Sequence, residues 1–452
     1  MSTAEPPSKP LTMPTEAPPT NGNSSEMTTH PLLINNTPHQ SPSSFPVHSP
    51  SDTTHLHNFS SASPSCTSDA LSSASTAFPA WAALPPPTKR DIFLQAASLL
   101  KSRLPSLQAT MTRETGASPS WAAFDTNLAI QILLDVSGRL SSLTGSIPTP
   151  SDPGTSALVY KEPYGVVLAI APWNAPHILG MRSIIYPLAA GNTVIFKAHE
   201  LSPLTHTALV TALHDAGLPP GVLTLLAHAP AQAAEVTRQL IEDPRVKKVN
   251  FTGSTNVGRV IAEMAGRCLK PVVLELGGKA PAIVWRDADV ELAARECAVG
   301  AFLHGGQVCM STERIIVHED IAEDFQSAFK KAIGELGLDG KGCLINGASV
   351  LKNQHLVRDA VSQGATLIHG SLPSSSPSPD NQNQAQAQDQ GHGAHMSPLV
   401  IKNPPLTSSI YSTESFGPTV SLYTISSETS ALSLANDTSY GLSAAIFTSD
   451  LR

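Results

Sequence analysis

Short runs of β-branched and other apolar residues alternate with longer amphipathic stretches from Gly165 onward. The amphipathic stretches have the apolar spacing of helices, and they separate most of the runs. Strands that alternate with helices in this way predict parallel strands with helical crossovers, which form a doubly wound α/β sheet. The runs that predict strands are VVLAIA (166–171), NTVIFKA (192–198), VLTLLA (222–227), VKKVNFTG (246–253), PVVLEL (271–276), PAIVW (281–285) and ERIIVHE (313–319).

Helical spacing also precedes the first strand. Apolar residues recur near this spacing from Lys89 to Met111, and a second helix is predicted from Ala122 to Leu140. Ser254 stands where a further helix should start, directly behind one of the strands. Order is therefore expected to begin near Ala77.

Two segments lack any periodic apolar pattern. Residues 1–75 are rich in Ser, Thr, Pro, Asn and His, and we expect a disordered tail, because such a segment buries too little surface to offset its ordering entropy. Residues 371–395 are rich in Ser and Pro and then in Gln, Asn and His, which predicts a solvated surface insert.

Composition narrows the class of protein. The formal net charge of -8 gives no basic surface for a nucleic-acid partner. No apolar run approaches the roughly 20 residues that a membrane helix needs, and the N-terminus lacks the pattern of a secretory signal. The five cysteines show no paired spacing, so neither a disulfide framework nor a metal site is predicted, and a cytoplasmic location is expected.

The segment IAPWNAP (170–176) follows the first predicted strand of the sheet. Ligands of open α/β sheets bind at the carboxyl ends of the strands, so Trp173 and Asn174 are well placed for a site. The Asn174 amide is a neutral donor suited to an oxyanion. The alternative is that Asn174 only caps the following turn.

Two later segments are suited to a nucleotide. In VIFKAHE (194–200), Lys197 and Glu200 could donate to and accept from ribose hydroxyls, although this segment taken alone favours an ordinary exposed pair on a loop. In NFTGSTNVG (250–258), Gly253 and Ser254 lead into a helix N-terminus whose free N–H groups suit a phosphate. The dinucleotide pattern GxGxxG is missing, and an ordinary Ser-capped helix is the alternative.

Cys309 lies behind a Gly-Gly pair in HGGQVCMSTER (304–314), and Glu275 ends a predicted strand in LELGGKAP (274–281). A glycine-rich loop lets the backbone approach a ligand, so the Cys309 N–H could join an oxyanion hole. A thiol becomes a useful nucleophile when a base serves it, and Glu275 could be that base. Most buried cysteines are inert packing residues, which fits Cys297 and Cys268 better than Cys309.

Taken together, these segments resemble the aldehyde dehydrogenase superfamily. The resemblance lies in the order of the motifs PWN, K-x-x-E, FTGS, LELGGK, GQ-x-C and E-x-FGP, and it covers roughly residues 77–452. KEPYGVVLAIAPWNAPHILG and CMSTERIIV are closest in look to the salicylaldehyde and vanillin (aromatic aldehyde) dehydrogenase branch. The fold that this resemblance implies is α/β, with a Rossmann-type cofactor domain and a second α/β catalytic domain.

The resemblance also implies a role for each matching residue. Cys309 matches the nucleophile that carries a thioester, Glu275 the general base and Asn174 the oxyanion-hole amide. Glu200 should repel a 2′-phosphate, so NAD is favoured over NADP. The cofactor contacts implied are Trp173 in the cleft, Lys197 and Glu200 at the adenosine ribose, Gly253 and Ser254 at the pyrophosphate, Glu414 at the nicotinamide ribose and Phe416 beside the nicotinamide.

The implied domains are an NAD-binding domain over 76–276, with part of an oligomerisation hairpin near 142–162, and a catalytic domain over 277–452. The family pattern continues past the position of Arg452 with a strand of the oligomer sheet, so the C-terminus is expected to be incomplete and homo-oligomer formation is left open. The reaction implied is NAD-dependent oxidation of an aromatic or aliphatic aldehyde to a carboxylate.

Two alternatives stay open beside this enzyme. A truncated, catalytically poor remnant could act as a cofactor-binding or regulatory protein, although the presence of Cys309, Glu275 and Asn174 together favours catalysis. An acylating relative would pass the thioester to coenzyme A, but such members usually lack the base that Glu275 matches.

Overall fold

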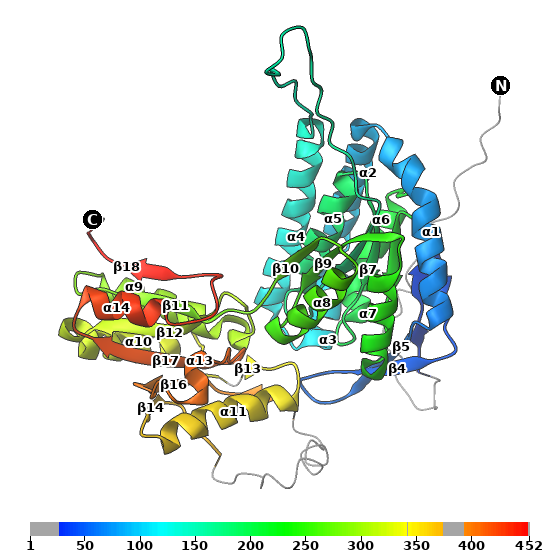
Figure 1. Ribbon diagram of the computed structural model, residues 1–452. Helices are drawn as coiled ribbons and strands as arrows, with labels where there is room; N and C mark the ends of the chain where they lie inside the picture. Colours follow the sequence, from blue (N-terminus) through cyan, green and yellow to red (C-terminus); the bar gives the residue numbers. More distant parts are fainter. Residues whose placement is uncertain (1–26, 341, 374–392, 451–452) are drawn as a thin grey trace, which may run out of the picture.

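The computed structural model describes residues 27–340, 342–373 and 393–450, and Figure 1 shows two lobes joined side by side. The larger lobe is built on a seven-stranded sheet. Its central strands are parallel and are flanked at one edge by the antiparallel strands β2 (Leu32–Ile34) and β3 (Thr37–His39). The parallel strands are, in spatial order, β10 (Val272–Glu275), β9 (Val246–Thr252), β6 (Val166–Ile170), β7 (Thr193–Lys197) and β8 (Leu223–Leu226).

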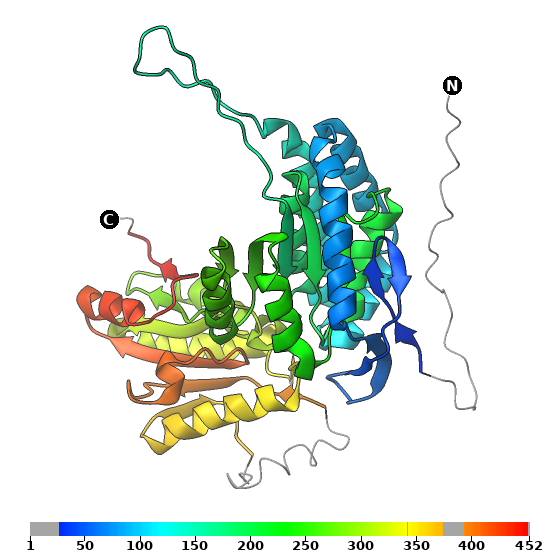
Figure 2. The same ribbon diagram turned by 45° about the vertical axis from the view of Figure 1, so that its right-hand side comes forward.

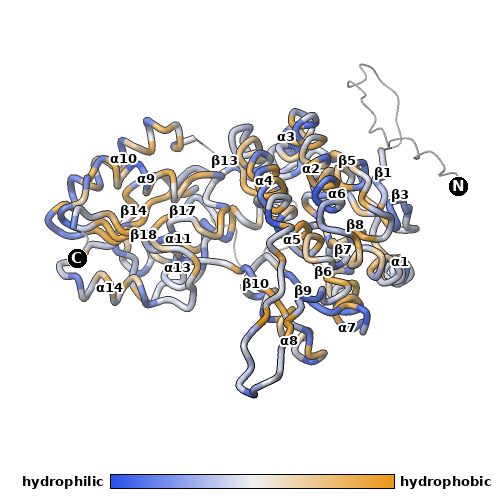
Figure 3. Tube along the Cα trace, turned by 90° about the horizontal axis from the view of Figure 1, so that it is seen from above, coloured by the Kyte–Doolittle hydropathy of each residue, from blue (hydrophilic) through white to orange (hydrophobic). Residues whose placement is uncertain are grey.

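Helices cover both faces of this sheet, so its central strands are mostly apolar and are fully buried. In Figure 3 the sheet runs between one row of helices that holds α1 (Pro64–Ala83), α7 (Ala233–Glu242) and α8 (Thr255–Arg267) and a second, thicker group. The helices of the second group are α5 (Pro176–Ala189), α6 (Pro203–Asp215), α2 (Pro86–Ser102), α3 (Leu104–Thr115) and α4 (Pro119–Arg139).

The smaller lobe has a six-stranded sheet of its own, parallel except where β14 runs against β16. Helices α9 (Val290–Phe302) and α10 (Ala322–Glu335) pack against each other and share one apolar cluster with the sheet. Helices α11 (Gly347–Ser362), α13 (Ser409–Ser412) and α14 (Glu428–Asn436) belong to two further clusters. The strands are, in order, β14 (Thr366–His369), β16 (Leu399–Lys402), β17 (Thr419–Ile425), β12 (Thr312–His318), β11 (Ala280–Val284) and β18 (Ala445–Phe447).

The predicted strands are confirmed within one or two residues, and so is the doubly wound α/β fold. The helix expected from Lys89 to Met111 is two helices, because the chain turns at Arg103 between α2 and α3. Pro105 lies in the first turn of α3, where its missing N–H costs nothing, whereas it would break a helix that ran through. The helix behind Ser254 is α8, with Ser254 as its N-cap.

The disordered tail expected over residues 1–75 is wrong for the part that the structure describes. Besides β2 and β3, this part contains a small sheet of β1 (Thr29–His30), β5 (His55–Ser60) and β4 (Ser44–His48), and α1 begins at Pro64. In β4 only Phe45 and Val47 are buried, and the exposed residues Ser44, Pro46 and His48 alternate with them. A strand with one solvent-exposed face needs few apolar residues. This explains why the composition of these strands resembles that of a disordered segment. Residues 1–26 lie outside the described residues.

A long two-stranded arm over residues 142–162 projects from the larger lobe beyond α4 (Figures 1 and 2). Its two branches are joined by a bridge between Ser146 and Val159. Several apolar side chains on it are exposed, among them Ile147, Leu158 and Tyr160. That the arm serves as an oligomerisation hairpin stays a prediction. Most of the insert expected at 371–395 falls on residues 374–392, outside the described part of the chain.

Within the described ranges, no helix is long and apolar enough to cross a membrane. The short strands β13 (Gly342–Cys343) and β15 (His395–Met396) pair with each other in the smaller lobe, close to the larger one in Figure 1.

Phe59 tests whether the N-terminal strands are part of the fold. It is fully buried on β5 and packs against Phe45, so Phe59→Ala should lower the free energy of unfolding by about 3–5 kcal/mol. Urea unfolding followed by circular dichroism measures this loss. The matched control is Phe124→Ala, which removes a ring that is 53% exposed and should cost far less. If the Phe59 variant unfolded at the same urea concentration as the parent, the N-terminal strands would not contribute to the stability of the fold, and the expectation of a disordered tail would stand.

Candidate functional site

The two sheets are connected by the segment between β10 and β11, and this segment is packed so tightly against the backbone of Cys309 that position 278 requires glycine. A Cβ on Gly278 would overlap the carbonyl oxygen of Cys309, and one on Gly277 would lie 2.5 Å from a carboxylate oxygen of Glu414. The Gly278 N–H donates to Glu414 Oε1 at 2.9 Å. The pair Gly277–Gly278 therefore brings three predicted residues together. They are Glu275 at the end of β10, Cys309 and Glu414.

Cys309 is half-buried in the loop ahead of β12. Burial raises the pKa of its thiol, and the nearby negative charges of Glu275 and Glu414 raise it further. The thiol is therefore neutral near pH 7 and needs a base to become nucleophilic. Cys297 differs, because it is fully buried in α9 and its pKa is raised to about 12, as suits a packing residue.

Asn174 reaches across to the loop of Cys309 from the other lobe. It is buried at the end of the loop that follows β6, and its Nδ2 donates to the backbone carbonyl of Gln307 at 2.9 Å. The backbone carbonyl of Asn174 accepts from the Trp121 indole N–H at 3.0 Å. The alternative that Asn174 only caps the next turn is not what the structure shows, since α5 has no side-chain cap from its own N-terminal residues.

Gln307 holds the cysteine loop in place, a role that the sequence interpretation missed although its motif includes this residue. The Gln307 amide donates to the carbonyl groups of His304 and Cys343, both at 3.1 Å, and accepts from the Ile345 N–H at 2.9 Å. Its side chain thus ties the loop to the strand pair beside it.

Lys197 and Glu200 are not an ordinary exposed pair on a loop. Lys197 is buried at the end of β7, with its Nζ 2.7 Å from His228 Nε2, and burial lowers its pKa. For Glu200 burial works to raise the pKa, but the charges of His199 and Lys197 outweigh it and the pKa is lowered. At neutral pH an ionised carboxylate therefore lies at this strand end, with His199 Nδ1 3.4 Å from it and within the electrostatic influence of Lys197.

Ser254 behaves as the alternative interpretation predicted, because its hydroxyl accepts from the Val257 N–H as the N-cap of α8. Gly253 joins that helix to the sheet through its N–H, which donates to the Glu275 carbonyl at 3.0 Å. A capped helix still directs its first N–H groups toward the strand ends, so the cap does not exclude a phosphate there.

Trp173 and Phe416 come from different lobes and meet edge to face, with ring centroids 5.9 Å apart. Phe416 has a φ of 49°, the left-handed region, which turns the backbone sharply at the FGP sequence. Burial raises the pKa of the neighbouring Glu414. Lys197 thus ends β7, and the other predicted cofactor residues lie on loops that adjoin a strand or at the start of α8.

A buried ion pair beneath these loops was not predicted. Lys279 Nζ lies 2.6 Å from Glu313 Oε2, and both side chains are almost fully buried. The other oxygen of Glu313 accepts from the Ser415 N–H and hydroxyl, both at 2.8 Å. Arg314 donates to the carbonyl of Lys279 and to two carbonyl groups at the end of α14. Charged residues that open an otherwise apolar strand, as in ERIIV, are the signal that could have indicated it.

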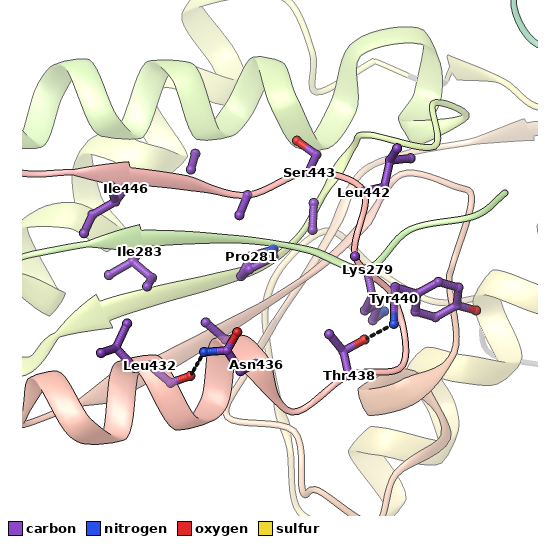
Figure 4. A pocket seen from close by; sticks show the side chains of 15 residues that line it. Lys279, Pro281, Ile283, Leu432, Asn436, Thr438, Tyr440, Leu442, Ser443 and Ile446 are labelled. Carbon is purple, nitrogen blue, oxygen red and sulfur yellow. Dashed lines mark hydrogen bonds between the residues drawn. The ribbon is translucent and has the colours of Figure 1, made fainter. Parts of the chain in front are cut away.

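A hollow of about 530 Å³ lies between β11, α14 and the chain that leads into β18 (Figure 4). Lys279, Pro281 and Ile283 line one side of it, and Leu432 and Asn436 line the other. Leu442, at its end, also lies against Gly278, so the hollow adjoins the cysteine loop. Among the described residues, no group of three or more His, Cys, Asp or Glu is arranged to hold a metal ion.

The sequence profile of the aldehyde dehydrogenase family matches residues 37–452. The vanillin dehydrogenase of Pseudomonas fluorescens is 40% identical over 389 residues, which cover 84% of this chain and 77% of that protein. The salicylaldehyde dehydrogenase of Pseudomonas putida is 35% identical over 391 residues, with the same shares covered.

Two solved structures extend the comparison to the fold. A salicylaldehyde dehydrogenase from Pseudomonas putida G7, complexed with salicylaldehyde, superposes with a TM-score of 0.86 at 31% identity, covering 94% of this chain and 86% of that one. An NAD-dependent benzaldehyde dehydrogenase from Corynebacterium glutamicum gives a TM-score of 0.84 at 30% identity, covering 93% and 88%. This chain belongs to the aldehyde dehydrogenase family.

Proposed function

We propose that this protein oxidises an aromatic aldehyde to its carboxylate with NAD, through a thioester on Cys309. The observation that carries the proposal is the meeting of Cys309, Glu275 and Asn174 at the junction of the two lobes, where Asn174 is bonded to the loop of Cys309. Relatives named for vanillin, salicylaldehyde and benzaldehyde support an aromatic substrate.

In the first step Glu275 takes the proton of the Cys309 thiol, directly or through a water molecule. The sulfur then bonds to the aldehyde carbon, and the carbonyl oxygen becomes an alkoxide. The Asn174 amide and the Cys309 backbone N–H donate to that oxygen. One such donor typically contributes about 2.7–4 kcal/mol to transition-state stabilisation.

Hydride leaves the carbon, for which a nicotinamide ring, when bound, would be the acceptor, and Cys309 then carries the acyl group as a thioester. Once Glu275 has released the thiol proton to solvent, it removes a proton from a water molecule, which attacks the thioester carbon. The carboxylate leaves and the Cys309 sulfur departs as a thiolate, ready for reprotonation. Because the aldehyde is bound to sulfur, hydride does not have to leave from the hydrated aldehyde. Glu275 acts as the base in both halves of the reaction.

The residues at the strand ends fit a dinucleotide. An ionised Glu200 beside a buried Lys197 can accept from and donate to the hydroxyl groups of the adenosine ribose, and the N-terminus of α8 suits the pyrophosphate. Glu414 could accept from the second ribose, and Phe416 and Trp173 could pack beside the nicotinamide. The family uses NAD or NADP, and the charge of Glu200 favours NAD because it would repel a 2′-phosphate.

A truncated remnant that only binds the cofactor is less favoured. Such a protein would have no need for a half-buried Cys309 near two carboxylates. It would also not need the Asn174 amide to be hydrogen-bonded to the loop that holds Cys309. An acylating enzyme is disfavoured as well, since Glu275 is present to activate water.

Catalysis itself is tested by two substitutions. Purified protein with NAD and benzaldehyde should form NADH, and Cys309→Ala should abolish this, because no thioester can form. Glu275→Gln should slow turnover by at least about 100-fold, the usual contribution of a general base. NADH absorbance at 340 nm measures both, with Cys297→Ala as the cysteine control. NADH formation by Cys309→Ala at the parent rate would refute the mechanism.

The electrostatic contact between Glu275 and Cys309 predicts a pH effect. Since the negative charge of Glu275 raises the pKa of the thiol, Glu275→Gln should lower that pKa, and the midpoint of alkylation by iodoacetamide should move to lower pH. Mass spectrometry of the Cys309 peptide follows this thiol among the five free ones. Exposed Glu242→Gln is the charge-matched control. An unchanged midpoint in Glu275→Gln would show that the two groups do not interact.

Cofactor choice is tested at Glu200. Removing its charge in Glu200→Gln should reduce the preference for NAD over NADP by about tenfold, equivalent to about 1.4 kcal/mol. The ratio of kcat/KM for the two cofactors with one aldehyde measures the change. A parent enzyme that prefers NADP, or a ratio that does not move, would contradict the role given to Glu200.

A further inference from the structure

Two buried carboxylates, Asp125 and Glu114, make the same unusual contact with two different helices. In each case both carboxylate oxygens accept backbone N–H groups from the first turn of a helix that begins with proline. Both helices follow neighbouring strands of the large sheet, β6 and β7. Neither carboxylate belongs to the residues that the proposed reaction uses directly.

Asp125 lies on α4 and caps α5. Its Oδ2 accepts from the His177 N–H at 2.9 Å and its Oδ1 from the Ile178 N–H at 3.1 Å. Asn174 precedes this helix by two residues, and the Trp121 indole, also on α4, donates to its carbonyl at 3.0 Å. The first turns of α4 therefore hold both the start of α5 and the backbone of Asn174.

Glu114 lies at the end of α3 and caps α6. Its Oε1 accepts from the Leu204 N–H at 3.1 Å, and its Oε2 accepts from the N–H and the hydroxyl of Thr205 at 2.8 and 2.6 Å. His57 Nε2 is 2.8 Å from the same carboxylate. Glu200 precedes α6 by three residues, so the capped end fixes one side of the loop that carries it.

These contacts matter because the site residues lie in short loops between a strand and a helix. Residues 171–175 connect β6 to α5, and 198–202 connect β7 to α6. The hydrogen bonds of the sheet anchor one end of each loop. The free N–H groups and the positive end of the helix dipole bind a carboxylate strongly, which anchors the other end.

The two caps differ in their charged surroundings. Glu114 faces the imidazole of His57, whereas the imidazole nearest to Asp125 belongs to His177, which is fully buried and whose pKa is lowered to about 3 by that burial. Burial also raises the pKa of Asp125, to about 7. The cap on α5 therefore depends on two backbone N–H groups, and within the described part of the chain no Lys or Arg forms an ion pair with Asp125.

We propose that Asp125 and Glu114 are positioning residues for separate parts of the reaction. Asp125 orients the Asn174 amide toward the developing alkoxide, and Glu114 orients Glu200 toward the ribose of NAD. This inference rests on the proposed roles of Asn174 and Glu200. It predicts that two similar caps, changed in the same way, affect different kinetic quantities.

The test compares Asp125→Asn with Glu114→Gln, each of which keeps the shape of the side chain and replaces one accepting oxygen by an NH2 group, which cannot accept a backbone N–H. Asp125→Asn should slow the burst of NADH in the first turnover at least tenfold while the Kd of NAD, measured by calorimetry, changes less than twofold. Glu114→Gln should raise that Kd about tenfold and slow the burst at saturating NAD much less. Equal effects of both variants on both quantities would overturn the inference.

A double-mutant cycle separates positioning from a general loss of structure. If Asp125 acts through Asn174, Asp125→Asn should slow the burst little further in an Asn174→Ala background. Additive effects would overturn the role of Asp125. If Asn174→Ala alone left the burst unchanged, the proposed oxyanion role would fail instead, and the two failures are thereby distinguished.

If Asp125→Asn or Glu114→Gln fails to fold, two substitutions that each remove a single hydrogen bond still test the proposal. Trp121→Phe removes the donor to the Asn174 carbonyl and retains an aromatic ring to stack on His304, so it should slow the burst without weakening NAD binding. Thr205→Val removes one hydroxyl donor to Glu114 and should weaken NAD binding alone. Weaker NAD binding in Trp121→Phe together with a slower burst in Thr205→Val would refute the proposal.

Discussion

One buried carboxylate, that of Glu313, supports the geometry of the smaller lobe beneath the site. It binds the Lys279 ammonium at the start of β11 and the Ser415 backbone and hydroxyl in the loop that holds Glu414 and Phe416. Taking charges out of water costs several kcal/mol per ion unless they are paired and fully hydrogen-bonded. The contacts of Glu313 meet that condition, and they place the segments next to Glu275, Glu414 and Cys309 in a single arrangement.

The larger lobe positions its share of the site by the same means. Asp125 and Glu114 bind the N-termini of α5 and α6, and the Asn174 amide then joins this lobe to the cysteine loop through the Gln307 carbonyl. Apolar packing forms both cores, but it is not directional. The orientation of the reacting groups therefore depends on a few buried polar contacts, each of which leaves an unsatisfied partner if broken.

The elements were predictable where the local pattern is strong. Strands such as β6 and β7 are covered on both faces, so they are mostly apolar and easy to recognise. Pattern reasoning failed in the N-terminal strands, where one face is exposed to solvent and few residues are apolar; in β4 this face consists of Ser44, Pro46 and His48. It also failed at Arg103, where a single proline divides a periodic stretch into two helices.

The sequence by itself determined which residue types stand at the strand ends, and so it indicated Cys309, Glu275, Asn174 and the nucleotide contacts. Only the tertiary structure decided how they are held. The Asn174–Gln307 bond joins residues 133 positions apart, and Glu114 reaches Thr205 over 91 positions. A local pattern never contains both partners of such a contact, and whether a carboxylate is buried against a helix N-terminus depends on which elements fold beside it.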